Sequence, residues 1–169
     1  LIQLTANDAL CNGQQGYASV VVIAGTAPFT YNWSTGDTGQ ILATSAGTYS
    51  VSVADSSGCV SVDDTFINEP STLQLNVNAD DVVCSDKVGL ARVSATGGTP
   101  PYTFLWNNQT PGDSVFLGDG MNEVTATDAN GCTATDSVLV LALPEPQYTL
   151  QSTPDTANQS MGTATVTIV

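Results

Sequence analysis

The sequence predicts an all-β protein made of tandem two-sheet sandwiches, and three observations carry that prediction. The chain repeats itself with a period of 73 positions, so that Cys11 and Trp33 recur as Cys84 and Trp106. Several segments alternate apolar and polar residues or are rich in β-branched residues, as strands are. No segment of useful length shows the 3.6-residue periodicity of an amphipathic helix.

The period divides the chain into two complete repeats and the opening of a third. We expect the repeats at residues 1–71, 72–146 and 147–169, joined by short, stiff proline-containing linkers. The third copy has Ala157 where the period places a cysteine, and its sequence ends within a core strand. Such a strand would leave an apolar edge unpaired, so either the polypeptide continues or another chain completes the module.

The strands expected within each repeat follow from local sequence. Residues 17–25 and 88–98 are rich in β-branched side chains, and residues 47–55 alternate strictly. The segments FTYNW and YTFLW place their aromatic side chains on one face at a period of two. We expect this face to form the core rather than a platform for carbohydrate, with these central members: Tyr31, Trp33, Phe104 and Trp106.

Turn sequences separate the expected strands. DSSG at residues 55–58 and DANG at 128–131 are typical of tight turns, and the segments 25–28 and 97–101, with glycine and proline, break the chain before the aromatic strand. Six or seven short strands, a central tryptophan and regular turns in about 70 residues favour an immunoglobulin-like sandwich of the polycystic-kidney-domain type.

Composition excludes several classes of partner. The 169 residues include 16 acidic and 2 basic side chains and no histidine, giving a formal net charge of −14. Without a basic surface, the chain cannot neutralise the phosphates of nucleic acid, and anionic membranes are disfavoured for the same reason. Four cysteines and a single lysine suit an oxidising compartment, so we expect an extracellular location.

The motifs of the repeat resemble those of a known family. CNGQQG and AGTYSVSVADSSGC in the first copy, and CSDKVG, GGTPPYTFLW and VTATDANGC in the second, resemble the SprB-type repeat of gliding-motility adhesins. The resemblance implies a very long surface protein of the Bacteroidota, exported by the type IX secretion system. It also implies that many such repeats form an extended filament used in adhesion or gliding, in which the repeats are stalk and spacer.

The two cysteines of each repeat lie 48 positions apart, and we predict the disulfides Cys11–Cys59 and Cys84–Cys132. A bond that closes such a loop contributes about 4 kcal/mol in the chain-entropy model, and a small sandwich needs a staple of this kind. Free buried thiols and bonds between chains are the alternatives. In a strict immunoglobulin order the two positions lie at opposite ends, so the bond requires the first strand's end to fold back or a different strand order.

Oxygen donors near the predicted loop ends form a candidate set of calcium ligands. Zinc is not expected, because the chain has no histidine and its cysteines never occur as a close pair. In the competing interpretation, aspartates such as Asp55 and Asp128 only begin turns by accepting hydrogen bonds from their own backbone. No other cofactor is expected. The candidate calcium ligands are Asp8, Asp55, Asp80, Asp81, Asp128 and Asn130.

Three Asp-Ser/Thr-apolar tripeptides look like the O-glycosylation motif of secreted Bacteroidota proteins. Their hydroxyl residues are Ser114, Ser137 and Thr156. Such short motifs also occur by chance, and the unmodified surface residue is the alternative at each position.

No catalytic site is predicted. A nucleophile would lack its usual base in a chain without histidine, and a pair of catalytic carboxylates would need a deep substrate cleft. We expect structural stalk or spacer repeats of a long secreted adhesin or filament, with neighbouring repeats of the same chain or filament as partners. The alternatives are a filament subunit completed by donor-strand exchange, and a carbohydrate- or calcium-binding module.

Overall fold

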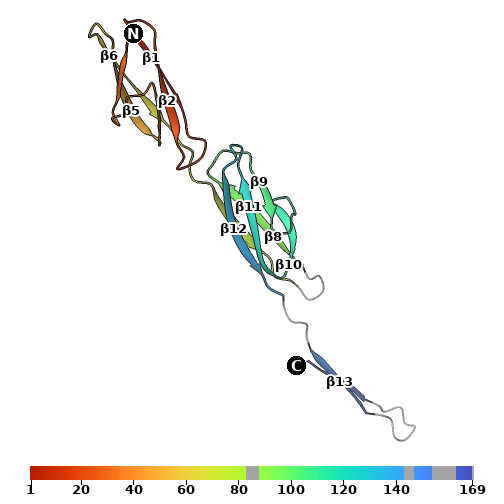
Figure 1. Cartoon of the computed structure of the whole chain (residues 1–169). Helices are drawn as coiled ribbons and strands as arrows, with labels where there is room; N and C mark the ends of the chain where they lie inside the picture. The colour runs from red at the N-terminus through yellow and green to blue at the C-terminus, as the bar shows by residue number, and fades with distance from the viewer. Residues whose placement is uncertain (83–87, 143–146, 154–162, 169) are drawn as a thin grey trace.

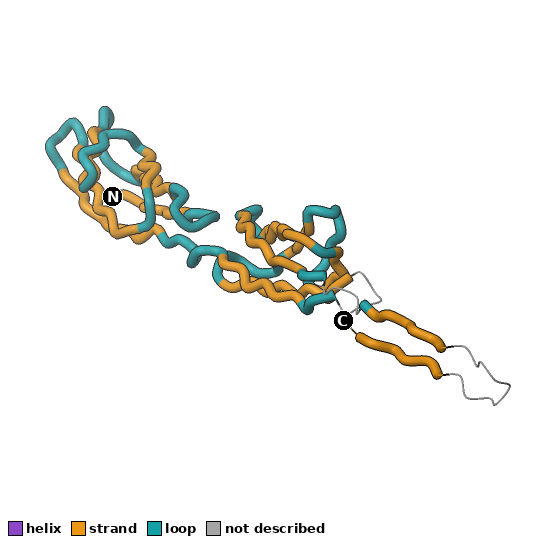
Figure 2. The backbone as a smooth tube through the Cα atoms, turned by 90° about the horizontal axis from the view of Figure 1, so that it is seen from below, coloured by secondary structure: helices purple, strands orange, loops and turns teal. Residues whose placement is uncertain are grey.

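The computed structural model describes residues 1–82, 88–142, 147–153 and 163–168. The predicted all-β class of tandem sandwich repeats is confirmed. Two sandwiches and a two-stranded hairpin follow one another in an elongated molecule (Figure 1). Figure 2 shows the same end-to-end order from a perpendicular direction. The described part of the chain contains no helix long and apolar enough to span a membrane.

The first repeat packs two antiparallel three-stranded sheets against each other. One sheet has the order β1-β2-β4 and the other β3-β5-β6. The strands of the first sheet are β1 (Ile2–Asn7), β2 (Gly16–Val22) and β4 (Ile41–Thr44). Those of the second sheet are β3 (Thr30–Trp33), β5 (Gly47–Ala54) and β6 (Val60–Ile67).

The second repeat has the same topology, with sheets β7-β8-β10 and β9-β11-β12. Pairing of Trp33 with Val51 between β3 and β5 recurs as pairing of Trp106 with Val124 between β9 and β11. The first sheet contains β7 (Gln74–Ala79), β8 (Val88–Thr96) and β10 (Ser114–Gly118). The second contains β9 (Thr103–Trp106), β11 (Gly120–Thr127) and β12 (Thr133–Val140).

The described part of the third segment is a hairpin of β13 (Tyr148–Thr153) and β14 (Thr163–Ile168). It corresponds in sequence to the β1–β2 pair that opens each sandwich. Its large apolar side chains lie open to solvent, with exposed fractions from 60% to 74%: Tyr148, Leu150, Val166 and Ile168.

Each sandwich closes around its tryptophan. Trp33 is 2% exposed and Trp106 is 1% exposed, and each indole N–H donates to a backbone carbonyl, that of Gly39 at 2.8 Å and that of Gly112 at 3.1 Å. Tyr31 packs against the core cluster of the first repeat, and its equivalent Phe104 packs against that of the second. The aromatic strands β3 and β9 thus face the cores, which favours packing over a carbohydrate platform.

The topology places two loops of one repeat at opposite ends of its sandwich. The backbone N–H of Ala9, in the β1–β2 loop, donates to the carbonyl of Asn68, which directly follows β6. The β5–β6 turn around Cys59 precedes the first residue of β6. Because β6 has eight residues, its length separates the two loops by roughly 26 Å.

The start of β2 can accept only glycine. A Cβ at Gly16 would lie 2.5 Å from the carbonyl oxygen of Asn7 and 2.5 Å from Cγ2 of the buried Ile67. We expect Gly16→Ala to lower the free energy of unfolding by about 1–3 kcal/mol, as overpacking of a filled core does. Urea unfolding followed by circular dichroism measures this difference.

Gly118→Ala is the matched control for this substitution. Gly118 ends the strand β10, and a Cβ there would meet nothing within 4 Å. We expect this exchange to change stability by less than about 0.5 kcal/mol. Equal losses for the two variants would show that the crowding at Gly16 is not what makes glycine necessary there.

Candidate functional site: the joint between the repeats

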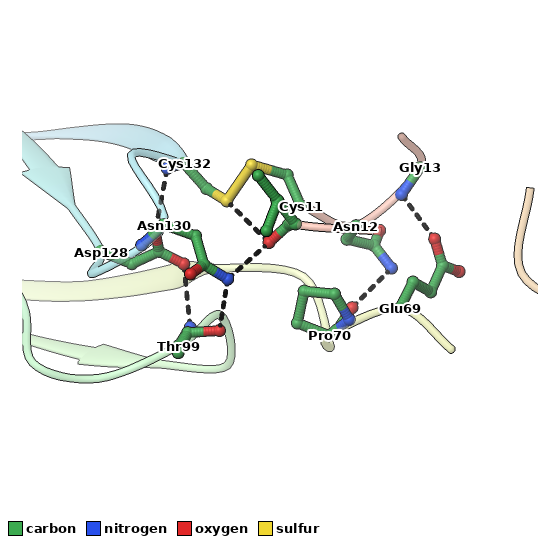
Figure 3. Close-up of a disulfide and its surroundings, with 10 residues drawn as sticks. Cys11, Asn12, Gly13, Glu69, Pro70, Thr99, Asp128, Asn130 and Cys132 are labelled. Atoms are coloured by element: carbon green, nitrogen blue, oxygen red, sulfur yellow. Dashed lines mark hydrogen bonds between the residues drawn. A yellow bond between two sulfur atoms is a disulfide. The ribbon is translucent and has the colours of Figure 1, made fainter. Parts of the chain in front are cut away.

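A disulfide joins the two repeats. Cys11, in the β1–β2 loop of the first repeat, is bonded to Cys132, which follows the β11–β12 turn of the second (Figure 3). The two Cα atoms lie 5.7 Å apart although the residues are 121 positions apart in sequence. Cys59 is an exposed free thiol.

The predicted pairings Cys11–Cys59 and Cys84–Cys132 are therefore wrong. A disulfide needs Cα atoms less than about 7 Å apart, and the topology puts the β1–β2 loop and the β5–β6 turn of one repeat a strand length apart. The loop of one sandwich instead meets the turn of the next. Cys84 lies outside the described residues.

The second repeat is also hydrogen-bonded to the first. The side-chain amide of Asn130 donates to the carbonyl of Leu10 at 2.9 Å and to Oγ1 of Thr99 at 3.0 Å (Figure 3). The Sγ of Cys132 lies 3.3 Å from the same Leu10 carbonyl oxygen. One turn of the second sandwich thus holds the β1–β2 loop both by a covalent bond and by a polar contact.

The loop that carries Cys11 also fixes the linker. The side-chain amide of Asn12 donates to the carbonyl of Pro70 at 3.1 Å, and its oxygen accepts from the hydroxyl of Thr72 at 2.8 Å. The backbone N–H of Gly13 donates to Oε2 of Glu69 at 2.6 Å. The linker is therefore bound along its length and does not act as a free tether.

The linker in turn packs on the second sandwich. Leu73 is buried, and the backbone N–H of Gly98 donates to the carbonyl of Ser71 at 2.8 Å. Gly98 has a φ of 58°, and a Cβ there would lie 2.7 Å from Oδ2 of Asp128. The glycine pair of the GGTPP segment thus permits the close approach of linker, turn and carboxylate.

A cavity of about 680 Å³ opens beside the joint. Its polar lining includes carboxylates and amides from both repeats and from the linker, and it contains no cationic side chain and no nucleophile paired with a base. These groups offer hydrogen bonds to water but no recognisable catalytic arrangement. The polar lining residues include Asp8, Asn68, Glu69, Thr99 and Asn130.

Asp128 shapes the turn that presents Cys132. Its Oδ1 accepts the backbone N–H groups of Asn130 and Cys132, each at 2.9 Å, and its Oδ2 accepts that of Thr99 at 2.8 Å. Burial of the carboxyl raises the pKa of Asp128, but these donors, with Thr99 the strongest, lower it by more. The net pKa lies below its ordinary value of 3.8.

Asp55 does the same in the first repeat. It accepts the backbone N–H groups of Thr26 at 3.2 Å and of Ser57 and Cys59, each at 2.9 Å. The N–H of Thr26, followed by that of Cys59, holds the pKa of Asp55 below 3.8. Both aspartates therefore serve as turn-forming acceptors, which is the role that the sequence offered as the alternative to calcium binding.

The other candidate calcium ligands are spread over the molecule. Asp8 accepts the backbone N–H of Asn68 at 2.8 Å, and Asp81 accepts that of Leu141 at 3.3 Å. Asp80 forms an exposed ion pair with Arg92 at 3.6 Å. Within the described ranges no three acidic, cysteine or histidine side chains are grouped so that they could hold a metal ion. Calcium binding stays a prediction.

The candidate glycosylation positions lie on the second sandwich and beyond it. Ser114, on β10, and Ser137, on β12, are both exposed. Thr156 lies outside the described residues. Modification at these positions stays a prediction.

The contacts across the joint were not predicted from the sequence, whereas the turn role of Asp55 and Asp128 was one of the two interpretations considered for them. The contacts of Asn12, Glu69 and Asn130 carry no spacing signal within one repeat. One signal was available for the disulfide, because its sequence separation of 121 equals one period of 73 plus the 48 positions between the cysteines of a repeat.

The lowered pKa of Asp128 predicts acid sensitivity of the turn that presents Cys132. A carboxylate whose folded pKa lies below its unfolded value contributes stability above about pH 4 and loses it as the pH falls through the folded value. We expect Asp128→Asn to lower the thermal midpoint at pH 6, and the difference from wild type to shrink toward pH 2. Differential scanning calorimetry over this pH range measures the change.

Glu123→Gln is the control for this pH dependence. Glu123 is an exposed carboxylate on β11, the strand that leads into the Asp128 turn. We expect its substitution to leave both the midpoint and its pH profile close to those of wild type. A loss in Asp128→Asn that is the same at pH 2 and pH 6 would contradict the electrostatic role of the carboxylate.

Comparison with known families agrees with this repeat structure. The SprB repeat model matches two segments, residues 4–38 and 76–111. Each match begins in or beside the first strand of a sandwich and ends after its tryptophan strand. No curated protein sequence matches the chain. Each sandwich therefore contains a segment that matches the SprB repeat, a structural repeat of cell-surface, adhesin-type proteins.

Proposed function

We propose that these repeats form a stiff stalk segment of a secreted cell-surface filament that holds an adhesive region away from the cell, in adhesion or gliding. The observation that carries the proposal is the joint. Two sandwiches are joined there by the Cys11–Cys132 disulfide as well as by the chain itself. Between domains that only a linker connects, relative motion is the default expectation, and a second covalent connection restricts it.

The joint resists bending because two separate segments of the chain connect the repeats. The linker connects the repeats through residues 68–73, and the disulfide connects them through the β1–β2 loop. Two covalent connections restrict rotation more strongly than one. The hydrogen bonds of Asn12 and Gly13 tie the β1–β2 loop to the linker, and that of Asn130 ties it to the second repeat.

The surface suits an isolated filament in an oxidising environment. A formal net charge of −14 on 169 residues repels neighbouring filaments. The disulfide suits the outside of the cell, where thiols are oxidised. Export by the type IX secretion system and a source in the Bacteroidota follow from the family resemblance and belong to the proposal.

Stiffness at the joint can be measured by residual dipolar couplings in a weakly aligned sample. We expect the couplings of both repeats in the oxidised chain to fit one alignment tensor, because the repeats tumble together. In the Cys11→Ser/Cys132→Ser double variant we expect two tensors of different magnitude, with the two repeats still folded around Trp33 and Trp106. The folded state is checked by the dispersion of the amide spectrum.

Cys59→Ser is the control, since it removes a cysteine but leaves the joint intact. It should give one tensor, as in wild type. Two independent tensors in the oxidised wild-type chain would contradict the stalk proposal. A single tensor in the double variant would assign the stiffness to the hydrogen bonds and not to the disulfide.

A second candidate function is favoured by the hairpin β13–β14. Its exposed Leu150 and Val166 would be covered if further strands completed a sandwich on it. In a donor-strand filament these strands come from another chain. We expect the purified chain to stay monomeric by light scattering at all concentrations if it is a stalk segment. Concentration-dependent polymers that Leu150→Lys abolishes would instead support self-assembly.

A further inference from the structure

The turn that presents Cys132 has an equivalent in the first repeat. Asp55 accepts the N–H of Cys59 at 2.9 Å, and Asp128 accepts that of Cys132 at the same distance. The backbone N–H groups that follow the two aspartates donate to the carbonyls of Thr26 and Thr99, at 3.0 and 2.9 Å respectively. The first sandwich thus displays the same cysteine in the same backbone setting.

These two equivalent cysteines differ in occupancy. Cys132 is bonded to the β1–β2 loop of the repeat before it, whereas Cys59 is exposed and free. Cys59 has no partner within its own sandwich, because Cys11 lies at the other end and is already bonded to Cys132. The structure therefore shows one filled and one open copy of the same site.

We propose that Cys59 is a joint site that forms a disulfide with the first cysteine of a SprB-type repeat preceding it in the same polypeptide. The proposal extends the proposed stalk function from one joint to the joints on both sides of a repeat. Two thiols form one S–S bond and release two protons and two electrons. The electrons reduce a disulfide oxidant, either a small molecule or a protein, to two thiols.

Charge favours a partner in the same polypeptide over one in a second chain. Two chains of this composition repel each other, each carrying a formal net charge of −14. A repeat held by a short linker is present at an effective concentration in the millimolar range, which no separate chain at ordinary concentration reaches. The joint between the first and second repeats is already closed in this way.

The open site differs from the filled site at two positions near the preceding repeat. Gly97, where a Cβ would lie 2.0 Å from the carbonyl oxygen of Thr72 in the linker, corresponds to Ala24 in the first repeat. The other position carries the side chain that donates across the joint. Asn130, whose amide donates to the Leu10 carbonyl, is replaced in the first repeat by Ser57. The shorter serine side chain cannot reach as far as the asparagine amide. The disulfide at Cys59 therefore has less help from hydrogen bonds, and Ser57→Asn should favour its formation.

The test is a tandem protein in which an added copy of residues 1–73 precedes Leu1 of the full chain. The added copy carries Ile23→Val and Val62→Ile as mass tags on exposed side chains. The protein is oxidised in a mixture of reduced and oxidised glutathione, its remaining thiols are alkylated, and it is cleaved before aspartates without reduction. Mass spectrometry identifies the linked peptides.

We expect two linkages. Cys11 of the original repeat is linked to Cys132, and the tagged peptide with Cys11 of the added copy is linked to the untagged peptide with Cys59. The extent of the second linkage at a limiting glutathione ratio should rise in the Ser57→Asn variant of the original repeat. In the Cys59→Ser variant, Cys11 of the added copy should be alkylated while the Cys11–Cys132 bond persists.

Several results would overturn the proposal. Alkylation of Cys59 of the original repeat, in a protein with the Cys11–Cys132 bond, would leave the stalk proposal intact and contradict only this inference. A bond from Cys59 to the first cysteine of its own copy, or a disulfide-linked dimer on a non-reducing gel, would also contradict it. Absence of both linkages would contradict the joint itself and the stalk proposal with it.

Discussion

An antiparallel sandwich with this strand order holds its β1–β2 loop and its β5–β6 turn apart by the length of β6. The two cysteines of one repeat occupy these two positions, so they cannot meet. When sandwiches follow one another along a line, the loop of one comes to the turn of the next (Figure 1). The disulfide between Cys11 and Cys132, the bound linker and the stiffness that we propose for the joint all depend on this constraint.

In a stalk under tension, the bond would also determine which part of the chain carries the force. A pull on the two ends passes through Cys11 and Cys132, so the 120 residues between them carry little of the force while the bond is intact. These residues include β2 to β11, which form most of both cores. Small sandwiches have limited cores and are marginally stable alone. A staple between repeats protects them from extension in a way that a staple within one repeat would not.

The turn that presents Cys132 depends on the charge and the position of Asp128. Asp128 orders the turn by accepting three backbone N–H groups, and that turn presents both Cys132 and the Asn130 amide to the preceding repeat. The aspartate, the glycine pair before the aromatic strand and the cysteine thus act together. The DANGC and GGTPP motifs, which lie far apart in the sequence, are therefore in contact in the fold.

The fold was largely predictable from the sequence, but the joint was not. Alternation, aromatic spacing and turn residues are local signals, and they identified the strands around Trp33 and Trp106 and the turn role of Asp55 and Asp128. The partner of Cys11 depends on how two sandwiches are placed relative to each other, which no local pattern encodes. The proximity of cysteines within one period favoured Cys11–Cys59, although the strand order argued against it.

Disulfide mapping of the oxidised 169-residue chain decides directly whether Cys11 is bonded to the second repeat or within its own. Cleavage before aspartates separates the cysteines into peptides 8–36, 55–62, 81–85 and 128–135. We predict a linked pair of peptides 8–36 and 128–135, with the Cys59 thiol of peptide 55–62 alkylated. A link between peptides 8–36 and 55–62 would contradict a disulfide between the repeats, because it would place the bond within the first repeat.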